Sequence, residues 1–487
     1  MNPSLATLVY CCGIATLFFL NRDSSVRTSP ALWLPVAYLW VVGSRPVPVW
    51  LGITTVEGTR NQLDGSPLDA AFFGLLSVVA VCVLVSRSRR TISFLNANWL
   101  ILSYFLFCLV SVLWSEFPGI SFKRWIKAVG DLLMILIVVT DEQPLTALSR
   151  LFSRVGFILV PISFLLIKYY PHLGKAYDDW TGAQTFTGAA LDKNMLGVIT
   201  LVISLGTFWH FLGLLRSQEK SKSRRRLLLA QGTLLALSIW LLITADSVTS
   251  IVSFLMGAGL MVATNLRFMR RHPAAVHALV VLLIVAVTSV MLLGGGASAA
   301  EALGRNPTLT GRTDIWAAVL PLAPSPMIGA GFESFWLSTH VHQKLEEALP
   351  GLGLRLNEAH DGYIEVYLEL GWVGLSLIIL LLIDGYRRSV KAFRRDPALG
   401  GLLIAYSLVI ITYSITEAGF RMLDPIWIFF LLAVVLASSI AAGIAVETPA
   451  EVSASSQSSQ LIAKPSFLVQ AGKPTTNWSM TRRGKAL

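Results

Sequence analysis

Residues 274–293 read AAVHALVVLLIVAVTSVMLL, a run of twenty residues without an Asp, Glu, Lys or Arg. A membrane-spanning α-helix needs about 20 predominantly apolar residues, so this run is long enough to cross a bilayer. Similar runs recur along the chain, in which charged residues make up 14%, against roughly 25% in ordinary soluble proteins. We therefore predict an all-α polytopic membrane protein.

The apolar runs predict about 12–13 transmembrane helices separated by polar stretches. The thirteen candidates are Leu5–Leu20, Ala31–Trp50, Leu68–Val85, Asn98–Trp114, Trp125–Thr140, Leu151–Tyr170, Leu196–Leu215, Leu227–Ile243, Ser247–Asn265, Ala274–Leu293, Tyr363–Ile383, Leu399–Ile415 and Pro425–Ala445. They divide the chain into an N-terminal helix bundle (1–293), a large loop (294–362), C-terminal helices (363–446) and a tail (447–487). The tail is rich in Ser, Thr and Lys, a composition that predicts disorder.

Lysine and arginine indicate which loops face the cytoplasm. Four basic clusters, at 87–90, 216–226, 267–271 and 387–395, fall on one side if the thirteen spans are right. We therefore expect a bacterial inner-membrane protein with its C-terminus in the cytoplasm, and with its N-terminus and large loop outside. The same placement accounts for the net charge of +11 without a nucleic-acid partner.

The large loop and the helix after it carry the candidate active region. Between Gly311 and Gly374 lie the sequences GRTDIW (311–316), GAG (329–331), HDGYIE (360–365) and ELGWVG (369–374). Loops longer than about 12–15 residues without evident secondary structure are usually functional or disordered. The aromatic and glycine content of this loop favours function.

Two other predicted outward loops carry cations, although basic residues are disfavoured on that side. Lys123, Arg124 and Lys127 follow one apolar run, and Lys193 with Asn194 opens another. Snorkelling at a helix end explains such cations equally well. Together with Arg312 they predict a site for a polyanion near the outer leaflet.

The order of these motifs resembles the O-antigen ligase and polymerase superfamily of membrane glycosyltransferases. The resemblance rests on the four sequences between 311 and 374, on Trp114-Ser115 with Lys123-Arg124, on Asp192-Lys193-Asn194 with Leu196-Gly197, and on Ser247 to Ser250. Within the superfamily the chain looks most like exopolysaccharide polymerases of the succinoglycan type. The resemblance implies transfer of a glycan from a polyprenyl diphosphate to a sugar hydroxyl.

A diphosphate leaving group needs positive charge, and arginine can bind phosphate oxygens bidentately. Arg312 is the first candidate for this role, and its alternative is a surface salt bridge with a loop carboxylate. The further substrate-binding candidates are Lys123, Arg124, Lys193, Asn194 and Glu365. No Asp-x-Asp pair appears in a predicted outward loop, so neither a metal nor another cofactor is expected.

His360 is the candidate general base, because an unperturbed histidine has a pKa of about 6.5. Glu369 lies two turns inside the predicted helix, where we expect it to pair with a cation or to orient His360. Asp361 is explained more simply by the preference of helix N-termini for acids. His340 and His342 are expected to face water.

The leading interpretation is a polymerase of lipid-linked repeat units that makes exopolysaccharide or O-antigen. A ligase that moves a finished glycan to lipid A core or another acceptor shares the donor and remains open. A transporter would show ionisable residues deep in several helices and an internal repeat, so it is less favoured. The expected partners are the lipid-linked donor, the glycan acceptor, the bilayer, and export or chain-length proteins.

Overall fold

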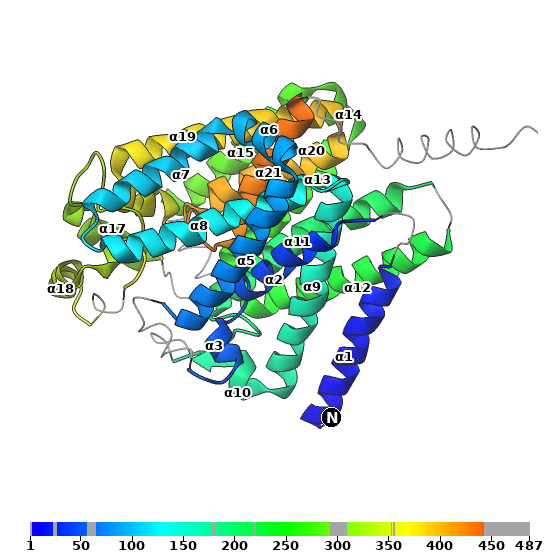
Figure 1. Cartoon of the computed structure of the whole chain (residues 1–487), viewed down its shortest axis with the longest axis horizontal. Coiled ribbons are helices and arrows are strands. Elements are labelled where there is room, and N and C mark those ends of the chain that lie inside the picture. Colours follow the sequence, from blue (N-terminus) through cyan, green and yellow to red (C-terminus); the bar gives the residue numbers. More distant parts are fainter. Residues whose placement is uncertain are drawn as a thin grey trace, which may run out of the picture. The chain divides into compact units, whose positions relative to one another are not determined.

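The computed structural model describes residues 2–22, 27–55, 65–177, 182–218, 221–292, 309–351, 353 and 356–442, and its long elements are all helices (Figure 1). The helices are α1 (Pro3–Leu20), α2 (Trp33–Val42), α3 (Val47–Trp50), α5 (Pro67–Ser86), α6 (Ser88–Ala97), α7 (Trp99–Ser111), α8 (Pro118–Val139), α9 (Pro144–Tyr169), α10 (Pro171–Gly174), α11 (Lys193–Arg216), α12 (Lys222–Ala245), α13 (Val248–Thr264), α14 (Arg267–Arg271), α15 (Pro273–Leu292), α17 (Leu309–Val319), α18 (Thr339–Ala348), α19 (Gly362–Arg395), α20 (Pro397–Tyr413) and α21 (Pro425–Ala442). Short 3-10 turns occupy Pro30–Leu32, Val112–Trp114, Leu320–Leu322 and Phe335–Leu337, and β1 (Lys175–Tyr177) pairs antiparallel with β2 (Gln184–Phe186).

The all-α membrane class is confirmed. Seven described helices are long and apolar enough to span a bilayer, and the bent pair formed by α6 and α7 makes eight. Four shorter apolar helices lie in other predicted spans. Each of the thirteen predicted runs contains a helix.

Buried and exposed helices are clearly separated. Nearly every described residue of α20 and α21 is buried, and α20 packs against α13, α19 and α21. By contrast, α1, α5 and α15 carry exposed apolar side chains around much of their circumference. Helices that are apolar all round belong in a protein core or in lipid. The second group therefore forms the lipid-facing periphery.

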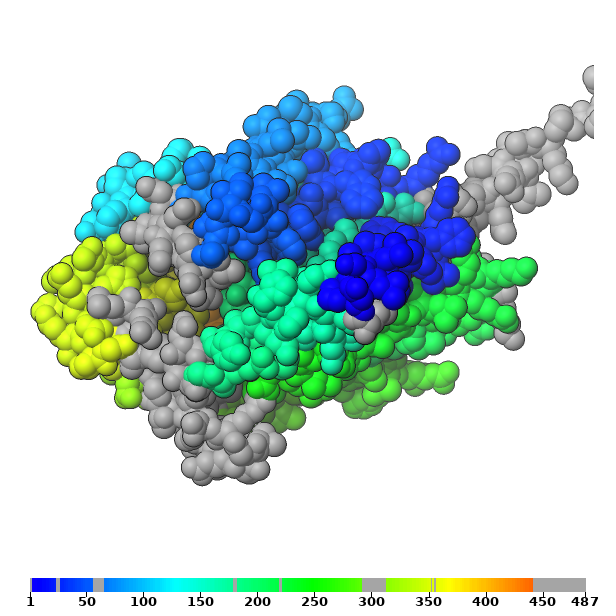
Figure 2. Space-filling model, turned by 90° about the horizontal axis from the view of Figure 1, so that it is seen from below, coloured from blue at the N-terminus to red at the C-terminus, as the bar shows by residue number. Residues whose placement is uncertain are grey.

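The polar loop that contains α17 and α18 lies at one end of the described bundle, and the helix ends that flank the basic cluster at 216–226 lie at the other. In Figure 1, α17 and α18 lie at the left, and the C-terminal end of α11 and the N-terminal end of α12 lie at the right. Figure 2 shows the same separation, with the yellow-green loop residues at one end and the green ends of α11 and α12 at the other. This arrangement agrees with loops that lie on two sides of a membrane.

A break in α19 explains the glycines of two motifs. Gly371 adopts φ 62° and ψ −162°, a backbone conformation that is essentially restricted to glycine, and it interrupts the helix. The loop at 326–331 supplies the hydrogen bonds that the break removes. Ala330 and Gly331 N–H groups donate to the Leu368 and Glu369 carbonyls, and Trp372 and Val373 N–H groups donate to the Pro326 and Met327 carbonyls. Inside a membrane such backbone groups need protein partners, so this loop stabilises the broken helix.

Two predicted boundaries need correction or comment. The span predicted from Trp125 begins at Pro118, so Lys123 and Arg124 lie on α8 and not in a loop. Proline at the first helical position starts the helix earlier than its apolar composition indicates. The predicted tail at 447–487 and loop residues 294–308 lie outside the described residues.

Candidate active site

Segments that are far apart in the sequence bring charged side chains together at the start of α19. Arg312 donates from Nη2 to Glu417 Oε1 over 3.1 Å. Arg421 donates from Nη1 to Glu358 Oε2 over 3.0 Å. His360 Nδ1 lies 2.8 Å from Glu358 Oε1 and 3.6 Å from Glu417 Oε2. We call these five residues the ion cluster.

The backbone around His360 positions it for these contacts. His360 has a left-handed conformation, with φ 52°. The next residue, Asp361, caps α19 by accepting hydrogen bonds from two backbone N–H groups of the first turn. Gly362 N–H donates to the Ser414 carbonyl over 2.8 Å, which ties the start of α19 to the end of α20. The capping role of Asp361 agrees with the simpler explanation given for it above.

A buried carboxylate holds the loop that carries Arg421. Asp131, in α8, is fully buried and accepts from Leu423 N–H over 3.1 Å and from Tyr38 Oη over 2.8 Å. Leu423 has a φ of 59°, so this turn of the loop is in the left-handed region. Asp131 thus fixes the loop between α20 and α21 from inside the helix bundle.

Glu333 connects the ion cluster to α8. Its carboxylate lies 3.9 Å from Arg124 Nη1 and 3.8 Å from Arg421 Nη2. Arg124 Nη1 also donates to the Glu333 carbonyl over 2.5 Å. The Glu333 residue is 3% exposed, so the two arginines balance a carboxylate that is removed from solvent. Glu333 therefore links Arg124 to Arg421 of the ion cluster, although neither Glu333 nor Arg124 is one of its five residues.

The local charges decide the protonation of His360. Burial alone would lower the pKa of His360, but contact with Glu358 and Glu417 raises it from 6.5 to about 10. Burial would raise the pKa of Glu358, but His360, Arg421 and Arg312 lower it to about 2. At neutral pH His360 is then a cation between two carboxylates. It must lose a proton before it can serve as the base predicted from the sequence.

Glu365 and Glu369 face the interior of the protein. Glu365 is 4% exposed, and its two carboxylate oxygens accept from Trp336 Nε1 and from Ala359 N–H. Glu369 Oε2 accepts from Glu333 N–H over 3.0 Å. Glu369 was predicted either to pair with a cation or to orient His360; in the described structure the carboxylates that contact His360 are those of Glu358 and Glu417.

The remaining predicted cations approach the same end of the bundle. Lys123 lies one residue before Arg124 on α8, and Lys193 and Asn194 open α11. The start of α11 packs beside α13, since a Cβ on Gly197 would lie 2.7 Å from Ser250 Oγ. From α13, Thr249 Oγ1 lies 3.1 Å from Thr416 Oγ1, and Thr416 precedes Glu417 of the ion cluster.

The two loop histidines differ from each other. His340 is exposed, as predicted. His342 is half-buried, with Nδ1 3.2 Å from the Gly353 carbonyl and Nε2 3.1 Å from the Trp336 carbonyl. The prediction that His342 faces water is therefore wrong, because its ring holds two parts of the loop together.

Glu358, His360 and Glu417 could also supply three ligand atoms to a metal ion, since these atoms lie within 4.8 Å of one another. Each carboxylate is already paired with an arginine. A divalent cation in this position would face the guanidinium groups of Arg312 and Arg421. The arrangement therefore suits an anion that competes with the carboxylates better than it suits a metal ion.

The sequence-based prediction missed Glu333, Glu358, Glu417 and Arg421. One signal was available. The segment 416–424, between the last two apolar runs, carries two acids and an arginine, and a cytoplasmic C-terminus would put it on the same outer side as Arg312. Pairing across about a hundred residues of sequence, as between Arg312 and Glu417, could not be read from spacing.

Comparison with known proteins identifies the segment that contains most of this site. Residues 233–379 match a family model described as O-Antigen ligase. This segment of the chain is thus similar to the O-antigen ligase family. The matched segment contains Arg312, Glu333, Glu358 and His360, and it ends before Glu417 and Arg421.

A relative from Rhizobium meliloti supports the same resemblance. The chain is 26% identical over 344 residues to the exopolysaccharide production protein ExoQ of Rhizobium meliloti (strain 1021). The aligned part covers 67% of this chain and 75% of the relative. The resemblance to the O-antigen ligase and polymerase superfamily is thereby confirmed.

Proposed function

We propose that this protein is a membrane glycosyltransferase that polymerises polyprenyl-diphosphate-linked repeat units into a polysaccharide. The observation that carries the proposal is that Arg312 and His360, which both lie in the segment similar to the O-antigen ligase family, contact the same carboxylate, that of Glu417. The relative's role in exopolysaccharide production favours a polymer as the product.

Arg312 and Arg421 are the proposed binding groups for the donor diphosphate. Their side chains are 22% and 35% exposed, so a ligand can reach both guanidinium groups. Without substrate, Glu417 and Glu358 occupy them. A diphosphate competes for the same planar donors and can accept parallel hydrogen bonds from each. Arg124, Lys123, Lys193 and Asn194 are proposed to contact the donor or the growing glycan nearby.

The ion cluster is also proposed to manage the proton of the reaction. The acceptor hydroxyl oxygen attacks the anomeric carbon, the bond from that carbon to the diphosphate oxygen breaks, and the diphosphate leaves with the electron pair. The hydroxyl proton passes to the unit formed by Glu358, His360 and Glu417, in which both carboxylates lie close to the imidazole ring. While the bond to the diphosphate breaks, the positive charge of the His360 imidazolium stabilises the negative charge that develops on the leaving group. Glu365 and Glu369 act here as positioning residues.

Ligation is the second candidate, and the description of the matched family model favours it. A ligase would transfer a finished glycan from the same lipid to lipid A core or to another acceptor. Lipid-linked intermediates of a deletion strain distinguish the two. We expect single lipid-linked repeat units to accumulate, whereas long lipid-linked chains would contradict the polymerase and support the ligase.

The location of the reaction is part of the same proposal. We place the ion cluster on the periplasmic face of the inner membrane, because the four basic segments then face the cytoplasm. Nucleotide sugars are normally absent from that outer compartment, which makes a lipid-linked donor necessary. Polysaccharide export or chain-length proteins are the expected partners for the product. No metal or other cofactor is included in the proposed reaction.

A further inference from the structure

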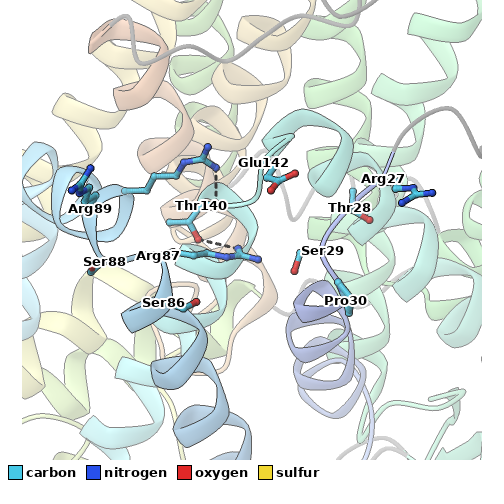
Figure 3. A pocket seen from close by; sticks show the side chains of 11 residues that line it. Arg27, Thr28, Ser29, Pro30, Ser86, Arg87, Ser88, Arg89, Thr140 and Glu142 are labelled. Carbon is cyan, nitrogen blue, oxygen red and sulfur yellow. Dashed lines mark hydrogen bonds between the residues drawn. The ribbon is translucent and has the colours of Figure 1, made fainter. Parts of the chain in front are cut away.

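A second charged region of the molecule lies around an open cavity of about 600 Å³. Three segments line it, as Figure 3 shows: residues 27–30 before α2, the corner between α5 and α6, and the turn after α8. Four of the lining residues are arginines: Arg27, Arg87, Arg89 and Arg90. Among the described residues that line this cavity, Glu142 is the one acid.

The cavity lies at the far end of α8 from the ion cluster. That helix starts at Pro118, close to Arg124, and ends at Val139, next to the Thr140 that lines the cavity. With a rise of about 1.5 Å per residue, the ends of such a helix are roughly 30 Å apart, close to the thickness of a bilayer core. The cavity is therefore separate from the site of the proposed glycosyl transfer.

Two of the arginines are held in place by backbone carbonyls. Arg87 Nη1 donates to the Ile137 carbonyl and to Thr140 Oγ1, and Arg90 Nη1 donates to the Thr140 and Asp141 carbonyls. These contacts satisfy the C-terminal end of α8, where positive charge is favoured. They do not neutralise either arginine, because a carbonyl carries no formal charge. The side chain of Asp141 is turned to the Ser29 and Gln143 N–H groups.

Hydroxyl groups also line the cavity, and exposed apolar side chains of α5 lie next to it. Thr28, Ser29, Ser86 and Ser88 line the cavity beside the arginines. Ser86 ends α5, whose preceding turns expose Val78, Val81 and Val85, the last of them 67% exposed. A ligand with an anionic head in the cavity could therefore lay its acyl chains along α5.

We propose that this cavity binds a phosphate group, and that its ligand is the headgroup of an anionic phospholipid. Basic pockets between membrane helices at the cytoplasmic surface suit such headgroups. The preference of cytoplasmic loops for basic residues would explain the arginines by their charge alone. It does not explain why they line a cavity, why two guanidinium groups are held by hydrogen bonds, or why hydroxyl groups lie beside them. A soluble phosphate compound shares the chemistry and is distinguished by the test.

The test follows the thermal unfolding midpoint of the full-length protein in a neutral detergent, since a ligand that binds the folded state raises it. Short-chain phosphatidylglycerol is titrated at constant ionic strength, with phosphatidylcholine and inorganic phosphate as parallel probes. We expect a saturable rise with phosphatidylglycerol and none with phosphatidylcholine. A rise with inorganic phosphate as well would assign the cavity to a soluble phosphate compound. No saturable rise with either anion would overturn the proposal.

Matched double variants locate the effect. Arg87→Gln with Arg90→Gln removes the held charges, and Arg27→Gln with Arg89→Gln removes lining charges for which the described structure records no hydrogen bond or ion pair. The second pair keeps the test valid if loss of the α8 contacts prevents folding. Each basic residue near an anionic surface contributes about 1 kcal/mol, so the loss of two should lower the apparent affinity about thirtyfold in each pair. The control, Arg387→Gln with Arg394→Gln, removes two exposed charges elsewhere in the predicted cytoplasmic clusters. Equal affinity in the wild type and in the Arg27 and Arg89 variant would contradict the assignment.

Discussion

Arg421 joins two carboxylates that come from different parts of the chain. It is bonded to Glu358 over 3.0 Å and lies 3.8 Å from Glu333, which is removed from solvent. Burial would lower its pKa, but the surrounding glutamates raise it. The residue is thus a fixed cation of the site. It holds two acids in place and is open enough to meet a phosphate.

Replacement of Arg421 by alanine should damage both folding and activity. Loss of Arg421 leaves the buried Glu333 with Arg124 as its remaining cation, so the cost should lie below the about 3–5 kcal/mol that is typical when one partner of a fully buried pair is removed. We expect a lower thermal midpoint and loss of polymer from Arg421→Ala. Arg421→Lys keeps the charge but cannot bridge two carboxylates with a planar fork, so it should recover stability only in part. The exposed Arg387→Ala serves as the control, and a wild-type midpoint for Arg421→Ala would refute the buried-pair assignment.

The protonation of His360 makes a prediction about pH. A histidine whose folded pKa is raised stabilises the protein fully below its unfolded pKa of about 6.5, and this contribution is lost as pH rises through the folded value. That folded value is about 10. The thermal midpoint of the wild type should therefore exceed that of His360→Gln at pH 7, and the difference should shrink toward pH 10. If the difference grew with pH, the imidazolium assignment would be wrong.

At the scale of elements, the break in α19 depends on a single residue. A Cβ on Gly371 would lie 2.3 Å from the Met327 carbonyl carbon, and the backbone there has φ 62°. Gly371→Ala should therefore displace the loop at 326–331 and with it Glu333, which follows that loop.

We expect Gly371→Ala to lower the yield of folded protein, measured by size-exclusion chromatography in detergent. Strain in this region of backbone space costs about 1–3 kcal/mol, and the steric overlap adds to it. Gly259→Ala is the matched control, because Gly259 lies in α13 and its Cβ would meet nothing within 4 Å. Alanine in a helix interior is favoured over glycine by about 1 kcal/mol, so the control should be at least as stable as the wild type. Comparable yields of the two variants would show that Gly371 is not required for the break.

At the scale of elements, helices could be predicted from the sequence, whereas contacts between distant segments could not. The thirteen apolar runs were sufficient to locate helices, because length and hydropathy are local properties. Arg312 and His360 were selected as candidates because they stand in a polar stretch at a helix mouth, and the structure brings them to one carboxylate, Glu417. The charged Lys123 and Arg124 concealed the start of α8 at Pro118. Gly329 packs against the distant backbone of Glu369, and Gly331 N–H donates to the Glu369 carbonyl. Contacts between remote segments, such as Asp131 with Leu423, leave no local signal.

At the scale of the whole molecule, the placement of basic segments predicts the topology. The ion cluster and the cavity of Arg87 lie at opposite ends of α8. If the basic end is cytoplasmic, alkaline phosphatase fused near Ala348 should be active, and the same enzyme fused near Ala450 should be inactive. The reverse pattern of activity would place the ion cluster in the cytoplasm. A nucleotide-linked donor would then become the more reasonable substrate.

The polymerase proposal can be tested most directly with purified protein and a synthetic polyprenyl-diphosphate repeat unit. We expect the wild type to produce a ladder of longer lipid-linked glycans, resolved by gel electrophoresis or mass spectrometry. Arg312→Ala and His360→Ala should form no ladder, whereas Lys344→Ala, which alters an exposed ion pair in the same loop, should match the wild type. Loss of a hydrogen bond to a charged group costs about 1.5–3 kcal/mol, so Arg312→Lys should be slowed even where its charge is kept. A normal ladder from Arg312→Ala, or no extension by the wild type, would contradict a polymerase that acts through this ion cluster.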